Sequence, residues 1–456
     1  MVFRRTPAKP LDRLIPKPPP DDKTLLEKVY WAAVEAAAPD RALLAALDRS
    51  KPQLARRVWV IAIGKASHAM ARAAVQWLAA RDVEPAGGLI IAPNPWVPPH
   101  RTISVAVGDH PLPGARSFAA AARLGEIASR MTMDDEAWVL LSGGASSLAA
   151  APEGAIKPDE LVQLFRLLLK AGLDITRTNL IRKRFLRWGA GRLAVALGPA
   201  RVRNYIISDV IGDDINTIGS GPCAPDTTDA GSVRALLQES RLWERVPVSL
   251  RRYLSSVERD SSGETPKPRN PIFQHIERKI IASNRLSLEA ASARAAEFGL
   301  RPRIVSASLA GRADDAGRRV ASALLAYRAD VERVCLLWGG ETTVHTGASK
   351  GIGGRCQELA LAAARELSLA YPESARIALL AAGSDGRDGP TDAAGAFADS
   401  GTWNAIQRAG HDPALALEEH DSHRALGAAD ALFRTGLTGT NVMDFVIGIA
   451  GGSTVD

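Results

Sequence analysis

Two short turns in the first half of the chain have residue types suited to binding an anion. In the first, a run of apolar residues at 58–63 leads into Gly64 and Lys65 and then into helical sequence. A lysine beside the free backbone amides of a helix N-terminus makes a natural site for a phosphate or a carboxylate. A surface lysine that completes a turn is the alternative, and the Gly-x4-Gly-Lys-Ser/Thr spacing of a P-loop is absent.

The second turn follows the apolar run at 138–141 and combines small side chains with hydroxyl groups. Its residues are Ser142, Gly143, Gly144, Ser146 and Ser147. Their N–H and hydroxyl groups can wrap phosphate or carboxylate oxygens, although a tight turn with serine caps is the alternative. The Gly-x-Ser-x-Gly spacing of a hydrolase nucleophile elbow is missing.

A carboxylate follows the next apolar run, at 205–208. Asp209 ends this expected strand, and Asp213 and Asp214 come shortly after it. A carboxylate at a strand end can hold Mg²⁺ or act as a base toward a hydroxyl group, and the sequence leaves both roles open for Asp209. Asp213 and Asp214 are equally suited to capping a turn.

The second half of the chain adds an acidic and a basic residue near glycines. Glu341 lies just past the Gly pair that ends the apolar run at 334–338, and Arg355 follows a glycine-rich stretch at the start of a helix. An arginine in such a position suits bidentate binding of a carboxylate or phosphate. The stretch lacks a complete Gly-x-Gly-x-x-Gly pattern and no strand immediately precedes it, which argues against a standard dinucleotide site.

Two further polar turns lie toward the C-terminus. A Gly-rich loop after the apolar run at 377–381 carries Asp385, Asp388 and Asp392. Its spacing does not match a calcium-binding EF-hand loop, so Mg–nucleotide binding is favoured. The last polar turn, near a helix start, contains Asn441.

The elements expected to position these turns form an α/β fold. Short apolar runs that end in Gly, Ser, Asn or Asp alternate with longer amphipathic segments, a pattern typical of βα units and mostly parallel sheets. The clearest strands are expected at residues 58–63, 88–92, 138–141, 205–208, 279–282, 302–306, 334–338 and 377–381. Ligands of open α/β sheets bind at the carboxyl ends of the strands, so the turns after these strands are where chemistry is expected.

The composition excludes several classes of protein. The chain has 456 residues, 46% of them hydrophobic and 23% charged, which indicates a globular protein of about two or three domains rather than a disordered or membrane-embedded one. The net charge of +7 comes from arginines spread along helical stretches, most densely at 181–192. We therefore favour small anionic ligands over nucleic acid. His110 is suited to a ligand contact or to a turn, and we slightly favour the turn.

The expected location and boundaries follow from simple features. The three cysteines have no paired spacing, which favours a reducing compartment, and we find neither a signal peptide nor a membrane helix. We therefore expect a cytoplasmic protein. Residues 255–271 are polar and contain Pro and Gly without periodicity, as in a linker. We expect a disordered arm at 1–22, an N-terminal domain at 23–255, a linker at 256–274 and a C-terminal domain at 275–456.

Taken in order, the turns resemble those of the glycerate 2-kinase family, the MOFRL-type glycerate kinases, which are often labelled hydroxypyruvate reductases. The matching blocks cover residues 33–448 and stand here as IGKAS, GDHPLP, LLSGGASSL, NLIRKRFLRWGAGRLA, ISDVIGDDINTIGSGPCAPD, GGETTVHTG, GGRCQELALA, AAGSDGRDGPTDAAGA and GTNVMD. Each block is modest alone, but the ordered set is highly specific. The chain departs from the family pattern at Cys356, where relatives usually have Asn, and a related hydroxy acid stays open as the acceptor.

The resemblance implies ATP-dependent phosphorylation of the 2-hydroxyl of D-glycerate, with Mg²⁺, to give 2-phosphoglycerate and ADP. It implies a larger N-terminal Rossmann-like α/β/α sandwich, a smaller C-terminal α/β domain, and an active site in the cleft between them. Lys65, Asp209 and Arg355 are then the expected catalytic residues. Lys65 and Arg355 would neutralise the glycerate carboxylate and the transferring phosphoryl oxygens. Asp209 would orient or deprotonate the 2-hydroxyl, or hold the metal.

The resemblance also implies roles for the other turns. The loop with Ser142, Gly143, Gly144, Ser146 and Ser147 would cradle an anionic group, and Glu341, Asp385, Asp388 and Asn441 would place Mg–ATP or substrate. Asp209 and Asp388 are the expected metal ligands. The expected partners are the small molecules D-glycerate and ATP, with no nucleic acid and no membrane, and the sequence does not set the oligomeric state. An NAD(P)H-dependent hydroxypyruvate reductase is the alternative function, against which stands the missing dinucleotide fingerprint.

Overall fold

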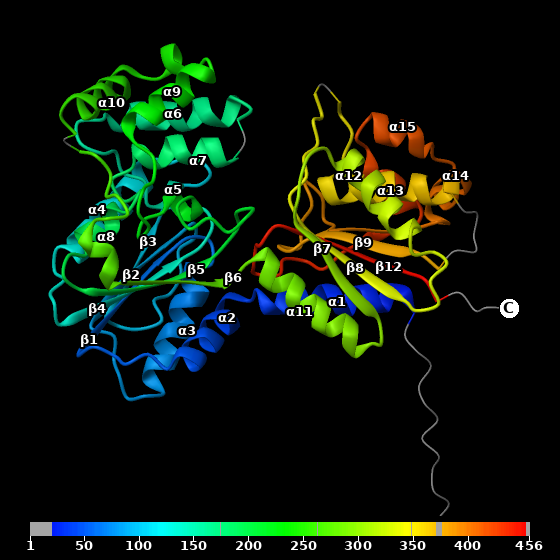
Figure 1. Ribbon diagram of the computed structural model, residues 1–456, viewed down its shortest axis with the longest axis horizontal. Coiled ribbons are helices and arrows are strands. Elements are labelled where there is room, and N and C mark those ends of the chain that lie inside the picture. The colour runs from blue at the N-terminus through cyan, green and yellow to red at the C-terminus, as the bar shows by residue number, and fades with distance from the viewer. Residues whose placement is uncertain (1–20, 174, 262, 348, 371–375, 453–456) are drawn as a thin grey trace, which may run out of the picture.

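The computed structural model describes residues 21–173, 175–261, 263–347, 349–370 and 376–452. It consists of two six-stranded sheets, each with helices on both faces (Figure 1). The expected α/β class with two units is confirmed. The arm expected at residues 1–22 lies outside the described residues, apart from Asp21 and Asp22 at the start of the first helix. No helix in the described part of the chain is both long and apolar enough to cross a membrane.

The first sheet is parallel throughout, in the order β3-β2-β1-β4-β5-β6. Its strands are β1 (Arg57–Ile63), β2 (Gly87–Ala92), β3 (Ile103–Val107), β4 (Asp135–Leu141), β5 (Arg201–Ile207) and β6 (Ile276–Ala282). Alternate residues of β1 enter the two apolar clusters on opposite faces of the sheet. A strand covered on both faces must be apolar at nearly every position, which is why the sequence predicts β1, β2 and β4 so clearly.

Helices cover both faces and one end of this sheet. One face carries α2 (Pro39–Ser50) and α3 (Ser67–Ala79), and the other carries α4 (Ala115–Ala128) and α8 (Arg192–Ala196). A separate apolar cluster joins α6 (Pro158–Lys170), α7 (Ile175–Arg184), α9 (Ala230–Glu239) and α10 (Val248–Asp260) into a helical layer above the sheet (Figure 1). The short helix α5 (Ala145–Leu148) lies between this layer and the sheet.

The second sheet is mostly antiparallel, whereas mostly parallel sheets were expected. Its order is β11-β10-β9-β12-β8-β7, and only β7 and β8 pair in parallel. Its strands are β7 (Arg301–Leu309), β8 (Val334–Gly340), β9 (Ala378–Gly383), β10 (Gly395–Asp399), β11 (Leu432–Phe433) and β12 (Asp444–Ala450). The difference arises because β12 returns from the last polar turn and inserts between β8 and β9, antiparallel to both.

Two groups of helices cover the second sheet. One face packs against α12 (Ala313–Leu325) and α13 (Arg355–Ala370), beside which lie α14 (Thr402–Arg408), α15 (Pro413–Glu418) and α16 (Ser422–Ala428). The other face packs against α1 (Asp22–Ala36) and α11 (Asn284–Glu297). The first helix of the chain therefore belongs spatially to the last sheet (Figure 1).

The chain crosses between the two sheets at places that differ from the expected boundaries. It crosses first between α1 and α2, and again between β6 and α11. Although β6 falls within the expected second domain at 275–456, it pairs with β5 in the first sheet. The expected linker at 256–274 is also held by the first unit, since its first residues lie in α10 and Glu264 forms an ion pair with Arg184.

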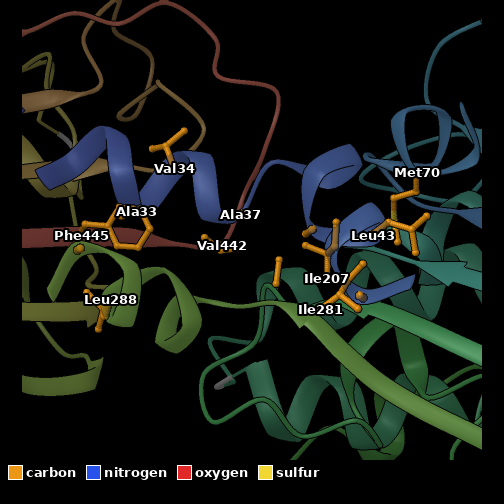
Figure 2. Close-up of a cluster of buried hydrophobic side chains, with 14 of the residues drawn as sticks. Ala33, Val34, Ala37, Leu43, Met70, Ile207, Ile281, Leu288, Val442 and Phe445 are labelled. Atoms are coloured by element: carbon orange, nitrogen blue, oxygen red, sulfur yellow. The ribbon is translucent and has the colours of Figure 1, made fainter. Parts of the chain in front are cut away.

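The two crossings meet in one cluster of buried apolar side chains. Ala37, at the first crossing, and Ile281, at the second, belong to the same cluster as Phe445 of the second sheet and Ile207 of the first (Figure 2). Polar contacts add to this contact region: the Thr440 hydroxyl donates to the carbonyl of Ala37 at 2.7 Å. The two units are thereby packed together where the chain passes between them.

Replacement of Tyr30 tests the packing of α1 against the second sheet. Its side chain is fully buried, its hydroxyl donates to the carbonyl of Gly383 at 2.8 Å, and its ring meets Phe433 edge-on with centroids 5.0 Å apart. We expect Tyr30→Ala to lower the free energy of unfolding by about 3–5 kcal/mol, because a cavity replaces the ring. The adjacent Trp31→Ala is the control: its side chain is 37% exposed, so its cost is about 1 kcal/mol or less. Urea unfolding followed by circular dichroism measures both, and equal losses would contradict the docking of α1.

Candidate active site

A cavity of about 290 Å³ lies where the carboxyl ends of the first sheet face the second unit. The predicted residues that line it are Lys65, Gly144, Ser146, Ser147, Asp209, Glu341, Arg355 and Asn441. Both units therefore contribute, as expected for a cleft. Asp385 lines a neighbouring cavity of about 560 Å³, which meets the first at Arg355.

The turn that carries Lys65 is locked to the serine-rich loop. The Lys65 amide donates to the carbonyl of Gly143 at 2.9 Å, and the Ala66 amide donates to the hydroxyl of Ser142 at 3.1 Å. Gly64 has a φ of +129°, and a Cβ there would lie 2.2 Å from the same hydroxyl oxygen. Only glycine tolerates that backbone and that approach. The Ser142 hydroxyl therefore positions Lys65 and does not face the cavity.

The other two serines are also bonded within the protein. The Ser147 hydroxyl donates to the carbonyl of Pro111 at 2.7 Å, and the Ser146 and Ser220 hydroxyl oxygens lie 2.5 Å apart. Both residues still line the cavity. They hold the loop in shape around it, and their contact with an anion stays a prediction.

Asp209 lies directly over this loop. A Cβ at Gly143 would be 2.0 Å from Oδ2 of Asp209, so the carboxylate is in direct contact with the glycine backbone. Burial raises the pKa of Asp209, against the opposing effects of Lys65 and Arg182, which lower it. A carboxylate with a raised pKa, next to cations and open to a cavity, can accept a proton from a bound hydroxyl group.

Two titratable residues that line the cavity were not among the predicted site residues, Arg182 on α7 and His110. Burial lowers the pKa of Arg182 to about 10, with Asp209 acting in the opposite direction, so the guanidinium is charged at neutral pH. Burial, followed by Lys65 and Arg182, lowers the pKa of His110 to about 4, so this imidazole is neutral there. The sequence signal for Arg182 was its position in the densest basic stretch, at residues 181–192. His110 was interpreted as a turn residue.

On the side of the second unit, Arg355 is held by two carboxylates. Its Nε and Nη2 donate to the two carboxylate oxygens of Asp444 at 2.5 and 2.9 Å, and its Nη1 donates to Glu341. Such a bidentate pair fixes the plane of the guanidinium. Asp444 begins β12, which was not among the strands expected from the sequence, and its contact with Arg355 was not expected either.

Asp388 has a structural role that the sequence did not suggest. Its Oδ1 accepts from the amide of Cys356 at 3.1 Å, and its Oδ2 accepts from the amide and side chain of Gln357 at 2.8 and 3.0 Å. It thus caps the helix that begins at Arg355, and burial raises its pKa to about 6. Asp388 lines neither of the two cavities, and its expected contact with a metal stays a prediction.

Charge divides the cavity into two walls. The wall from the first unit contains the basic residues Lys65 and Arg182 and the acidic residue Asp209. The wall from the second unit contains Arg355, which forms ion pairs with Glu341 and Asp444. Among the described residues, no three His, Cys, Asp or Glu side chains come together to hold a metal ion. A cavity with cations and carboxylates on facing walls is suited to phosphoryl transfer, because that reaction depends on positioning and charge neutralisation.

The fold and site define a two-unit α/β phosphotransferase, and comparisons with known proteins identify the family. Residues 25–255 match a domain of unknown function (DUF4147), and residues 334–444 match the MOFRL family. The chain is 34% identical to a glycerate 2-kinase of Pyrococcus horikoshii, over 92% of this chain and 96% of the relative. The structure is similar to the crystal structure of a glycerate kinase from Thermotoga maritima, with a TM-score of 0.82 and 32% identity, over 94% of this chain and 99% of the other.

A third relative, from Agrobacterium vitis, carries the provisional name hydroxypyruvate reductase and is 35% identical over 92% of this chain and 93% of its own length. All three proteins match this chain over nearly their whole lengths and span both units of the fold. The chain belongs to the MOFRL-type glycerate kinase family.

The contact between Gly143 and Asp209 yields a test of the site. A methyl group on Gly143 would lie 2.0 Å from Oδ2 of Asp209, so the carboxylate must move. We expect Gly143→Ala to lower kcat for glycerate phosphorylation about 100-fold, the usual effect of displacing a reacting group by about 1 Å. The control is Gly231→Ala on α9, where the added methyl group meets nothing closer than 3.6 Å. Wild-type turnover by folded Gly143→Ala protein would show that Asp209 is not a reacting group.

Proposed function

We propose that this protein is a glycerate 2-kinase that transfers the γ-phosphoryl group of ATP to the 2-hydroxyl of D-glycerate. The observation that carries the proposal is a single cavity that brings Lys65 and Asp209 of one unit opposite Arg355 of the other. Two anionic substrates must approach each other for this reaction, and a cavity with cations on both walls reduces their mutual repulsion. The kinase names of the relatives support the same conclusion.

Asp209 is the residue that orients the acceptor. The oxygen of the 2-hydroxyl bonds to the γ-phosphorus, the bond from that phosphorus to the bridging oxygen breaks, and ADP leaves with the electron pair. The hydroxyl proton goes to the carboxylate of Asp209. Burial, which raises the pKa of this carboxylate against the effect of Lys65, makes it a better proton acceptor than an exposed aspartate.

Lys65 and Arg355 neutralise the charge that develops during transfer. Lys65 is held by backbone hydrogen bonds to the serine-rich loop, and Arg355 is held by Asp444 and Glu341. The guanidinium of Arg355 therefore needs little reorganisation when substrate binds, and preorganised charges stabilise a transition state most effectively. The loop of Ser142, Gly143, Gly144, Ser146 and Ser147 supports this arrangement.

The residues around the cavity also fit a magnesium ion. Mg²⁺ uses one or two protein carboxylates together with substrate phosphates and water, and Asp209 and Glu341 both present carboxylates to the cavity. When bound, the ion would neutralise charge on the β- and γ-phosphates. Asp388 fits this task less well, because both of its oxygens already accept hydrogen bonds from α13. Asp385 and Asn441, on neighbouring turns, would contact the nucleotide from the second unit.

Phosphorus NMR tests the proposal directly. Purified protein with D-glycerate, ATP and MgCl2 is expected to yield 2-phosphoglycerate and ADP, whose resonances separate from those of 3-phosphoglycerate and ATP. In the same assay, Lys65→Ala and Arg355→Ala should each turn over at least about 100-fold more slowly, as when one preorganised charge or donor is removed.

The control is Lys51→Ala, because Lys51 is an exposed residue at the end of α2 and should not affect turnover. The appearance of 3-phosphoglycerate would contradict the proposed acceptor atom. NADH oxidation in the presence of hydroxypyruvate, without ADP formation from D-glycerate, would contradict the kinase assignment and support the reductase.

A further inference from the structure

Arg182, Lys183 and Arg184 are consecutive basic residues at the end of α7. Each has a buried polar nitrogen atom, but the three side chains have different partners. Lys183 lies 2.8 Å from a carboxylate oxygen of Asp226, and Arg184 forms a bidentate pair with Glu264. Arg182, just before them, points the other way and lines the cavity. Among the described residues, no carboxylate oxygen lies within the ion-pair distance of 4.0 Å from its guanidinium.

The guanidinium of Arg182 is only partly satisfied by the protein. Its Nη2 donates to Oδ1 of Asn179, one turn earlier on α7, and its Cζ lies over the ring of Phe165, 5.2 Å from the ring centroid. Its Nε is buried and has no hydrogen-bond partner among the described residues. A buried, charged donor without a partner is costly. The cost is removed if a ligand in the cavity accepts the bond.

We propose that Arg182 and Asn179 bind the carboxylate of the acceptor substrate and so make the enzyme specific for 2-hydroxy acids. This inference rests on the proposed kinase function and assigns its substrate-selecting residues. A guanidinium matches a carboxylate in a bidentate geometry. The Asn179 side chain accepts from Arg182 through Oδ1, which leaves its Nδ2 as a further donor.

The charges on the two walls explain why a carboxylate, rather than the nucleotide phosphates, belongs at Arg182. The first-unit wall presents two basic side chains, Lys65 and Arg182, but only one carboxylate among its residues that line the cavity, Asp209, and this excess of one basic group matches a single carboxylate. The second-unit wall has two carboxylates around Arg355, which suits a phosphate chain that arrives with a cation. The buried apolar side chain of Phe165 lines the same cavity and lowers the local dielectric, which strengthens the charge pairing.

Calorimetric titration with D-glycerate alone tests the assignment without depending on turnover. We expect Arg182→Met to raise the Kd for D-glycerate about 100-fold, which corresponds to the loss of a charged hydrogen bond pair. The affinity for an unreactive Mg–ATP analogue should not change. Arg187→Met is the matched control, because Arg187 is an exposed arginine just beyond the same helix. Arg182→Lys, which keeps the charge but loses the bidentate geometry, should show an intermediate Kd.

A neutral analogue separates carboxylate recognition from a merely structural role. Wild-type protein should bind D-glycerate more tightly than D-glyceramide, in which an amide replaces the carboxylate, and Arg182→Met should lose that preference. Asn179→Asp provides a second variant if Arg182→Met does not fold. It places a carboxylate beside the guanidinium, and we expect it to abolish D-glycerate binding without lowering thermal stability.

The outcomes distinguish this inference from the proposed function. If wild-type protein makes 2-phosphoglycerate but Arg182→Met binds D-glycerate as tightly as wild type, the inference is wrong and the kinase assignment stands. If the variant instead loses affinity for the Mg–ATP analogue, Arg182 contacts phosphate and the inference is again wrong. If wild-type protein forms no 2-phosphoglycerate, the proposed function is wrong, whatever the variant does.

Discussion

The packing of apolar side chains at the two chain crossings holds the second sheet against the first. There, α1 from the beginning of the chain and α11 from its middle lie side by side under the second sheet; α1 leads into α2 of the first unit, and α11 follows β6 of the first unit. The side chains around Ala37, Ile281 and Phe445 form one buried cluster (Figure 2). Burial of apolar surface is the dominant stabilising term in such packing. Without it, the two walls of the cavity would have no defined separation.

The cavity depends on that separation because neither unit holds a complete site. The first unit supplies Lys65, Arg182 and Asp209, and the second supplies Arg355 with its carboxylate partners. Hydrogen bonds fix the turn that carries Lys65 on one wall and the guanidinium of Arg355 on the other. The turn with Lys65 is locked by Gly64 and Ser142, and Arg355 starts a helix that Asp388 caps. The arrangement therefore brings two preorganised half-sites together, as phosphoryl transfer between two bound substrates requires.

Several residues of the site could be predicted from the sequence because they follow recognisable strands. Lys65, Asp209 and Glu341 follow apolar strands directly, and strand ends in α/β sheets point toward ligands. Arg182 could not be predicted because it lies on a helix among other basic residues, and only tertiary packing shows that Lys183 and Arg184 are paired while Arg182 faces the cavity. Asp388 looked like a metal ligand because a capping aspartate and a ligating aspartate look alike in a glycine-rich loop.

The boundaries of the two units were also hard to predict. A polar segment with proline and glycine resembles a linker, but Glu264 within it binds the buried Arg184. The strand β6 and the helix α1 are local elements whose partners lie far away in the sequence, so no local pattern shows which sheet they join. The same holds for β12, which is placed between β8 and β9 by long-range pairing.

A crystal structure of the protein with D-glycerate, Mg²⁺ and an unreactive ATP analogue would test most directly the claim that the two walls bind different substrates. The account predicts the glycerate carboxylate at the guanidinium of Arg182, its 2-hydroxyl at Asp209, and the γ-phosphate between Lys65 and Arg355. A glycerate carboxylate bound at Arg355, or a nucleotide whose phosphates occupy the wall of Arg182, would contradict it.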